Sequence, residues 1–361
     1  MQLRFHFIAG ILATMAACSR AQVPLVTADG FAVPQPGHEF YFPRDYGAHP
    51  EFKLEWWYLT GHLFAKDGRR FGYQATFFRS AAPDRSTQVY LAHMAVIDAK
   101  SGKFYYQERL NREGWDADAE IGELNVHNGP WSLRMTDDKS PRMELHGGVR
   151  ADVLFQLDLS SAKPLVVFGE NGVSRKGAEP TAASYYLTFP RLGTAGTITF
   201  GSETIPVKGE SWMDHEISSS QLGANQIGWD WVGLQLGDGR EIMLYRLRLR
   251  DGTADPASSL TWVDAAGRTK KSVFTWEVLA RWTSPTTGAA YPSRVRITTT
   301  DPATEKTTVF ILEPLAQNQE LAGRLGGIPY WEGACRVLSA DGREIGSAYL
   351  ELTGYAKDLK L

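Results

Sequence analysis

Cysteine is scarce in this sequence, with 2 among 361 residues. Cys18 and Cys335 lie far apart, so a framework of several disulfides is excluded and the core must hold the fold together. No Cys-x-x-Cys or His-Glu-x-x-His spacing occurs, and the histidines are scattered. The sequence therefore predicts no metal site and no bound cofactor.

An excess of charge of one sign is also missing, because 38 Lys and Arg residues face 41 Asp and Glu residues. Without a long basic run, neither nucleic acid nor an anionic membrane surface is an expected partner. Hydrophobic residues make up 43% of the chain, and 35 glycines indicate many turns. This composition predicts a globular protein, and the length suggests two domains of ordinary size.

Three further signatures are absent. A serine-hydrolase elbow requires Gly-x-Ser-x-Gly, and the nearest strings, which begin at Gly172 and Gly209, lack the last glycine. Glycine-rich phosphate loops before a helix do not occur. No amphipathic helix pattern of ten residues stands out, although a short helix is possible near 317–325. Serine-triad hydrolysis is therefore excluded, and an all-β fold is favoured.

The one long apolar run follows Arg4 and is too short to span a bilayer as a permanent helix, which is typical of a secretory signal. Met-Ala-Ala-Cys at 15–18 ends this run and resembles a bacterial lipobox. We expect Cys18 to become the lipidated first residue of an exported envelope lipoprotein, and Ser19 indicates the outer membrane. The alternative is simple secretion with cleavage near Ala21.

Short strands separated by turn residues fill the chain from residue 51 onward. One hairpin is expected at 55–64 and 70–79, and a second at 229–236 and 241–249 around an Asp-Gly turn. Further strands are expected at 88–98, 103–109, 131–136, 142–149, 153–159, 185–189, 197–207, 259–263, 273–282, 293–299, 307–312, 330–338 and 344–353.

The two hairpins resemble each other when Trp57 is placed over Trp229 (229 − 57 = 172 residues), with a short gap before the Asp-Gly-Arg turns. This similarity indicates a tandem repeat, although two ordinary Asp-Gly hairpins can also match by chance. Antiparallel strands in this number predict barrels, because closure removes exposed edges and leaves an interior able to hold one small ligand. The expected segments are a signal peptide at 1–17, a lipidated tether and docking segment at 18–50, and barrels at 51–195 and 196–361.

Several strings resemble one known family. These are EWWYLTGHL, GYQATFFR, YLAHMAVID, YYLTFPRL, GESWMDHE, GWDWVGLQL, YWEGACRV and YLELTGY, which run from about residue 50 to the end. They look like the AttH-type family, often labelled "predicted secreted hydrolase", which is similar to the carotenoid 1,2-hydratases (hydroxyneurosporene synthases). The resemblance implies two lipocalin-like barrels that meet at an interface, and a pocket for an extended apolar ligand. In some relatives it implies catalysis on isoprenoids or pericyclic ring closure.

Hydration of an isolated alkene requires a carboxylic acid that stays protonated near neutral pH, aromatic faces for a carbocation, and a water molecule. Asp214 and Asp230 are the candidate proton donors, and His215 is the candidate orienting partner. Period two places Asp230 on the apolar face of its strand. The structural alternative remains open: Asp214 and Glu216 cap turns, His215 is an interface histidine, and Asp230 pairs with an arginine such as Arg246 or Arg79.

Aromatic and polar residues around these acids are the candidate ligand-binding set. They are Trp212, Glu216, Trp229, Trp231, Tyr245, Glu55, Trp57, Arg79 and His93. Glu55 shares a strand face with Leu59 and needs a buried partner, for which Arg79 is the candidate, so structural pairing is favoured over catalysis at that position.

Two functions of different classes follow. As an enzyme, the protein would be a hydro-lyase that adds water to, or rearranges, an isoprenoid or polyene near the interdomain interface. As a non-catalytic envelope lipoprotein, it would bind a lipid or hydrophobic metabolite and serve a transporter, with an ABC-type permease as a candidate partner. In both cases the partner is a hydrophobic small molecule, and the membrane is reached only through the lipid anchor.

Replacing Cys18 with serine tests the anchor. We expect Cys18→Ser protein to move from the membrane fraction to the soluble envelope fraction, because each buried CH₂ of a lipid chain contributes about 0.8 kcal/mol of membrane affinity. Fractionation and intact-mass measurement report the change. Continued membrane retention of the variant would contradict the lipobox interpretation.

Overall fold

The computed structural model describes residues 23–82 and 84–359, so the predicted signal and Cys18 lie outside the described residues. The regular elements are a 3₁₀-helix, η1 (Arg44–Tyr46), and β-strands β1 to β23. All the named strand pairs are antiparallel, and the expected all-β class is confirmed. No helix in the described ranges is long and apolar enough to cross a membrane. The helix expected near 317–325 is wrong, because this stretch holds β21 and turns.

The first domain is one large sheet with the strand order β4-β3-β2-β1-β13-β12-β9-β8-β7-β6-β5, while β10 and β11 pair with β12. Its strands are β1 (Leu54–Ala65), β2 (Arg70–Ala81), β3 (Gln88–Asp98), β4 (Lys103–Arg112), β5 (Ala117–Ala119), β6 (Asn125–Asn128), β7 (Trp131–Asp137), β8 (Arg142–Val149), β9 (Val153–Ser161), β10 (Val166–Phe168), β11 (Ser174–Arg175), β12 (Ala183–Phe200) and β13 (Glu203–Ser220).

The second domain is a separate sheet with the order β17-β16-β15-β14-β23-β22-β20-β19-β18, and β21 pairs with β22. Its strands are β14 (Gln226–Leu236), β15 (Glu241–Leu249), β16 (Ser259–Val263), β17 (Thr269–Ser272), β18 (Phe274–Thr283), β19 (Ala290–Thr300), β20 (Thr307–Pro314), β21 (Glu320–Leu321), β22 (Tyr330–Leu338) and β23 (Glu344–Thr353).

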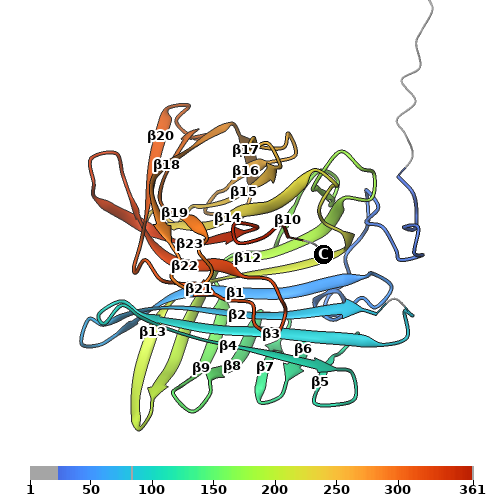
Figure 1. Ribbon diagram of the computed structural model, residues 1–361, viewed down its shortest axis with the longest axis horizontal. Helices are drawn as coiled ribbons and strands as arrows, with labels where there is room; N and C mark the ends of the chain where they lie inside the picture. The colour runs from blue at the N-terminus through green and yellow to red at the C-terminus, as the bar shows by residue number, and fades with distance from the viewer. Residues whose placement is uncertain (1–22, 83, 360–361) are drawn as a thin grey trace, which may run out of the picture.

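The first sheet curls into a nearly closed barrel and the second into a half-barrel, which confirms the tandem lipocalin-like architecture (Figure 1). Period two fills the first barrel with one face of each strand, including Trp57 and Leu59 from β1 and Leu145 and Phe155 from β8 and β9. The second core is filled in the same way by residues such as Leu234. Side chains therefore fill both interiors. This differs from the expectation that barrel closure leaves an interior able to hold a small ligand.

The expected domain boundary at 195/196 differs from the structure. That position lies inside β12, and β12 and β13 form one long hairpin that belongs entirely to the first sheet. The strand expected at 197–207 spans the turn of this hairpin at Gly201. The change of sheet falls between Ser220 and Gln226, so the acid-rich stretch of β13 belongs to the first domain.

The internal repeat is in a different register from the expected one. Trp57 faces the first core, whereas Trp229 packs at the domain interface, so these two residues are not equivalent. A shift of one residue pairs Leu63 with Leu234 (234 − 63 = 171), and both lie in their respective cores. The same separation aligns the Asp-Gly-Arg turns without a gap (238 − 67 = 171).

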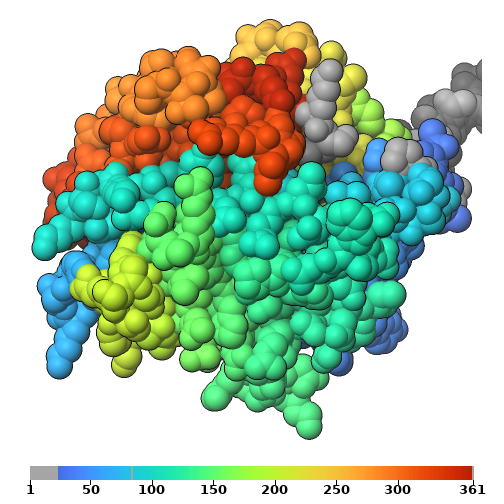
Figure 2. Space-filling view, turned by 60° about the horizontal axis from the view of Figure 1, so that its bottom comes forward, coloured from blue at the N-terminus to red at the C-terminus, as the bar shows by residue number. Residues whose placement is uncertain are grey.

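The second sheet lies against the outer face of the first barrel, over β1, β2, β3, β12 and β13 (Figure 1). In the space-filling view, the teal residues of the first barrel meet the orange and red residues of the second domain along a continuous seam (Figure 2). Strands such as β1 are therefore buried on both faces. One face fills the barrel and the other faces the second domain.

Candidate functional site: an interdomain cavity

A row of polar residues crosses the outer face of the first barrel. The strand register places Thr188, Asp214, Tyr58, Thr76 and His93 directly beside one another on five successive strands. Residues opposite each other in neighbouring antiparallel strands share a face. We call this row the floor.

Two rows of the second sheet form the facing surface, which we call the roof. The first row consists of Tyr245, Trp231, Glu351 and Glu332 in register across β15, β14, β23 and β22. The second row consists of Leu247, Trp229, Thr353 and Tyr330. Both rows point away from the second core, because the residues between them, such as Leu352 and Trp331, fill that core.

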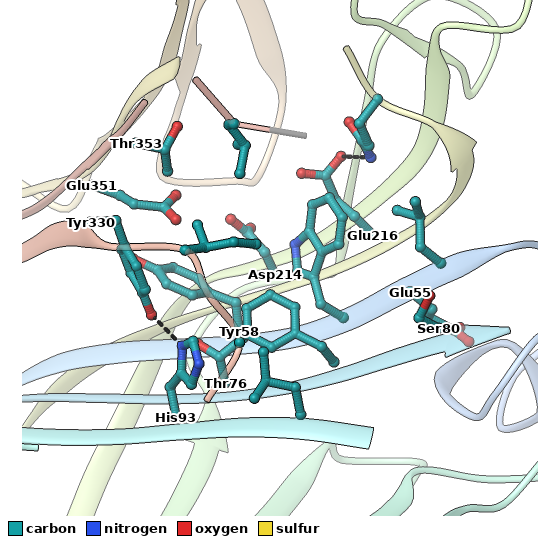
Figure 3. Close-up of a pocket in the computed structure, with 18 of the residues that line it drawn as sticks. Glu55, Tyr58, Thr76, Ser80, His93, Asp214, Glu216, Tyr330, Glu351 and Thr353 are labelled. Carbon is teal, nitrogen blue, oxygen red and sulfur yellow. Dashed lines mark hydrogen bonds between the residues drawn. The ribbon is translucent and has the colours of Figure 1, made fainter. Parts of the chain in front are cut away.

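Between floor and roof lies a cavity of about 470 Å³, within the usual size range of small-molecule sites (Figure 3). Its lining is mainly aromatic and aliphatic. The aromatic residues are Trp56, Tyr58, Phe78, Tyr186, Trp229, Trp231, Tyr245 and Tyr330, and the acidic residues are Glu55, Asp214, Glu216 and Glu351. Such a cavity suits an apolar molecule with few polar groups.

Asp214 is the acid of the floor row, with 2% of its surface exposed. Burial raises the pKa of its carboxyl to about 7, although hydrogen bonds from Thr188, Tyr186 and Trp212 favour the ionised form and oppose this shift. Those donors lie 2.6, 2.7 and 2.7 Å from its oxygens. No cation pairs with Asp214 among the described residues. The carboxyl is therefore poised to exchange a proton near neutral pH.

Glu351 is a second acid of this kind, on the roof. Burial raises its pKa to about 7, with a further contribution from the charge of Glu216, while the hydrogen bond from Trp229 opposes the shift. The indole Nε1 of Trp229 lies 2.8 Å from Glu351 Oε2. Its cross-strand neighbour Glu332 is fully buried, and burial raises the pKa of that carboxyl well above its usual range.

Polar groups gather around His93 and Tyr330 at one end of the cavity, and some of them lack hydrogen-bond partners. Tyr58 donates to Glu332 Oε1 at 2.6 Å, and Tyr330 Oη lies 2.7 Å from His93 Nδ1 (Figure 3). Burial lowers the pKa of His93 to about 4, so its ring is neutral at pH 7. In the part of the chain that the structure describes, Gln74 Oε1, His93 Nε2 and Glu332 Oε2 lack hydrogen-bond partners. Buried water or a polar group of a ligand would satisfy such atoms.

Glu216 differs from these acids because it has a cation. Lys176 Nζ lies 2.9 Å from Glu216 Oε2 and 4.5 Å from the ring centres of both Tyr186 and Tyr245. Lys176 comes from the long segment between β9 and β12, so that segment contributes this side chain to the cavity lining.

A loop of the second domain covers the edge of the cavity. The backbone N–H groups of Arg324, Leu325 and Gly326 donate to the Glu108 carboxylate at 3.1, 2.7 and 3.4 Å. Glu108 is the cross-strand neighbour of His93 and extends the floor row by one strand. The loop is thereby fixed across the domain boundary, with Leu325 lining the cavity.

The structure does not bring His215 and Asp230 to Asp214. His215 follows Asp214 directly, so its side chain points to the opposite face of β13, where it lies 2.7 Å from Glu55 and stacks on Trp57. The expected role of His215 as the orienting partner of Asp214 is therefore wrong. Asp230 lies at the end of the second core, and this placement removes it from the cavity lining.

Two arginines and a tyrosine hold Asp230, as the structural alternative expects. Arg246 lies 3.0 Å away, Arg248 makes a close ion pair, and the Tyr355 hydroxyl donates at 2.9 Å. These contacts compensate the buried charge, whereas Asp214 has no such cation within residues 23–82 and 84–359. Asp214 is therefore the proton-donor candidate that the geometry retains.

Glu55 and Arg79 form the expected pair, with Arg79 Nε 2.9 Å from Glu55 Oε2. His49 Nδ1 and His215 Nε2 also lie within 2.9 Å of Glu55 Oε1, and the three residues have the spacing of a metal-ligand cluster. The guanidinium and hydrogen bonds already satisfy this carboxylate, and His49 also bonds Asp45. The arrangement is that of a buried ion-pair network, in which a further cation would be opposed by Arg79.

The remaining candidates divide by the face of their strand. Trp229, Trp231, Tyr245, Glu216 and His93 line the cavity, and Glu55 and Arg79 reach its edge. Trp212 lies behind Asp214 and donates to it, while Trp57 belongs to the first core.

Glu351, Tyr58, Tyr186, Lys176 and Tyr330 line the cavity but are missing from the candidates chosen by sequence. In the alternating string of β23, Glu351 stands between leucines and has the pattern of a solvent-facing residue. The docking of the second sheet on the first barrel, which no local pattern encodes, turns that face inward.

The fold and the cavity define a two-domain lipocalin-like protein with an aromatic, acid-bearing site between its domains. The chain belongs to the AttH-like family, whose sequence profile matches residues 33–355. A crystal structure of a Nitrosomonas europaea protein assigned as an AttH is 36% identical, with a TM-score of 0.81 over 90% of this chain and 100% of that chain.

More distant solved structures share the architecture. Kievitone hydratase from Nectria haematococca is 14% identical, with a TM-score of 0.67 over 93% of this chain and 97% of its own. CghA in complex with Sch210972 is 13% identical, with a TM-score of 0.55 over 92% and 98%. At these identities the likeness shows the fold alone. No curated protein matches the sequence significantly.

The Glu55 network generates a stability prediction. Glu55→Gln leaves Arg79 buried without its counter-charge, and breaking a buried pair typically costs about 3–5 kcal/mol. We expect urea unfolding to show a loss of this size. The matched control is Glu203→Gln, which removes an exposed partner of Arg69 and should change the free energy of unfolding by less than about 1 kcal/mol. Equal effects of the two variants would contradict this account.

The raised pKa of Asp214 generates a prediction about pH. Between about pH 4 and 7 the folded state keeps a proton that the unfolded state releases, so the free energy of unfolding falls as pH rises through this range. We expect Asp214→Asn to remove up to about 4 kcal/mol of that fall, from roughly three pKa units at 1.36 kcal/mol each. NMR of ¹³Cγ-labelled aspartate should show one carboxyl titrating near pH 7 that disappears in Asp214→Asn. Titration of every aspartate below pH 5 would contradict the assignment.

Proposed function

We propose that this protein binds an unsaturated apolar small molecule, of the isoprenoid, polyene or lipid class, in the interdomain cavity and adds water across one of its double bonds. The observation that carries the proposal is Asp214, a carboxyl with a pKa near 7 on the wall of a mainly aromatic cavity. Alkenes are weak bases, so their protonation requires an acid held next to the substrate and shielded from bulk water.

The proposed reaction conserves atoms and charge. The Asp214 carboxyl gives its proton to one alkene carbon, the π electrons form the new C–H bond, and the other carbon becomes a cation. A water oxygen bonds to that carbon, and the surplus proton of the water returns to the Asp214 carboxylate. Tyr58 and Trp231, which line the cavity, offer ring faces that stabilise a nearby cation by about 0.5–2 kcal/mol each.

The relatives support this proposal at different levels. Membership of the AttH-like family supports the architecture, and one of the solved structures with the same fold bears the name of a hydratase. The choice of water addition rests on the cavity itself, where three hydrogen-bond donors orient Asp214 and no cation neutralises it in the described chain. We also propose that the protein is an exported lipoprotein, supported by the lipobox-like string that ends at Cys18.

β-Farnesene, an acyclic isoprenoid, serves as a probe for this function. We expect the wild-type protein to bind it, with quenching of tryptophan fluorescence, and to form a product heavier by one water, labelled when the solvent is H₂¹⁸O. Asp214→Asn should bind β-farnesene and form no product. Asp230→Asn should keep the reaction in its folded fraction while losing about 3–5 kcal/mol of unfolding free energy, because it breaks a buried ion pair.

Binding without water addition in the wild-type protein would contradict the enzymatic proposal and favour a carrier. Absence of binding would contradict the cavity as an apolar site. Trp56→Ala, in the cavity lining, should weaken binding, whereas Trp115→Ala, at a position 67% exposed, is the matched control that should not.

A further inference from the structure

We infer that Glu351 and Asp214 together form a two-carboxyl site for a cation, in which Glu351 stabilises from the roof the positive charge that Asp214 creates from the floor. The inference rests on the proposed function and adds to it a second residue and a class of ligand. That class is an apolar chain that carries a tertiary cationic centre.

The strand register and the hydrogen bonds between the sheets place the two carboxyls face to face. On one side of Glu351, its cross-strand neighbour Trp231 donates to Tyr186 at 2.8 Å, and Tyr186 in turn donates to Asp214 at 2.7 Å. On the other side, its neighbour Glu332 accepts a hydrogen bond from Tyr58, the floor residue beside Asp214.

These two links hold Glu351 on the roof opposite the neighbouring floor residues Asp214 and Tyr58. Figure 3 shows its carboxyl group and that of Asp214 in the same space between the sheets. Both residues line the cavity, so a molecule bound there contacts both of them.

The surroundings of Glu351 leave its negative charge free to attract a bound cation. Trp229 gives it one hydrogen bond, and two titratable side chains that interact with it, Glu216 and Glu332, are acids. Glu216 has Lys176 as its cation, whereas neither Asp214 nor Glu351 has a basic partner among the described ion pairs. A positive charge between two such carboxyls is attracted by both, most strongly where water is displaced.

Aromatic rings complete the site. Trp229 and Trp231 flank Glu351 on the roof, and Tyr58 lies below on the floor. Indole and phenol faces attract cations, and the apolar lining accepts the rest of the chain. A bound carbocation would thus meet negative charge from both domains and ring faces between them.

A stable mimic tests the site without turnover. N,N-dimethylfarnesylamine carries a tertiary ammonium where the cation would form, and the isosteric hydrocarbon with an isopropyl end carries none. At pH 8.5, where both carboxyls are ionised, we expect the wild-type protein to bind the ammonium about a hundredfold more tightly than the hydrocarbon. Calorimetry gives the ratio of the two dissociation constants.

Single variants Glu351→Gln and Asp214→Asn should each lower this ratio about tenfold, and the double variant should bring it near one. Hydrocarbon affinity should stay unchanged in all three variants, which shows that the cavity is intact. Glu344→Gln, an exposed partner of Arg70 outside the cavity lining, is the matched control and should keep the wild-type ratio.

An unchanged ratio in Glu351→Gln would overturn this inference, even if Asp214→Asn behaves as expected. If Glu351→Gln lost hydrocarbon binding as well as the preference for the ammonium, the inference would also be overturned, because Glu351 would then act only on the cavity structure. Failure of the wild-type protein to bind either probe would instead contradict the proposed function.

Discussion

The covering of the outer barrel face by the second sheet is the constraint on which the rest of this structure depends. An antiparallel sheet commonly keeps one face in water, so polar residues on that face need no partner from the protein. Here β1, β2, β3 and β13 lose that water, and the floor residues must find partners within the protein. Asp214 has its partners in the first domain, whereas Tyr58 and His93 have partners in the second. Tyr58 is hydrogen-bonded to Glu332, and His93 is hydrogen-bonded to Tyr330. Domain docking is therefore the physical origin of the perturbed acids.

Four acids of this protein show two contrasting environments. Glu55 and Asp230 lie at the ends of the two cores, and each is neutralised by arginine. Asp214 and Glu351 face the space between the domains and have hydrogen-bond donors but no cation in the described chain, so burial raises the pKa of each to about 7. In a buried ion pair the attraction between the partners offsets the cost of desolvating them, whereas an unpaired carboxyl carries that cost without such an offset. Uncompensated acids that persist in a cavity are the ones available for chemistry.

Local patterns were sufficient to predict the hairpins. Alternation and Asp-Gly turns gave β15, β16, β22 and β23 with the observed bounds, because these features act within a few residues. The boundary between domains was not predictable in this way, since β12 and β13 continue past the point where an average strand would end. Proximity in sequence suggests that His215 acts with Asp214, but successive residues of a strand point to opposite faces. Glu351 was missed because its pattern matches a solvent-facing position.

The place of the cavity explains why both domains are needed. Side chains fill each barrel, and in the described part of the chain the aromatic, acid-bearing cavity lies where two sheet faces meet. Asp214 comes from the first sheet, and Glu351 comes from the second. In a separated domain, water would solvate each carboxyl and return its pKa toward the ordinary value of an exposed acid, because burial is the largest cause of both shifts. The acid strength of this site is thus a property of the domain interface, and any change that loosens the interface acts on the chemistry without touching a carboxyl.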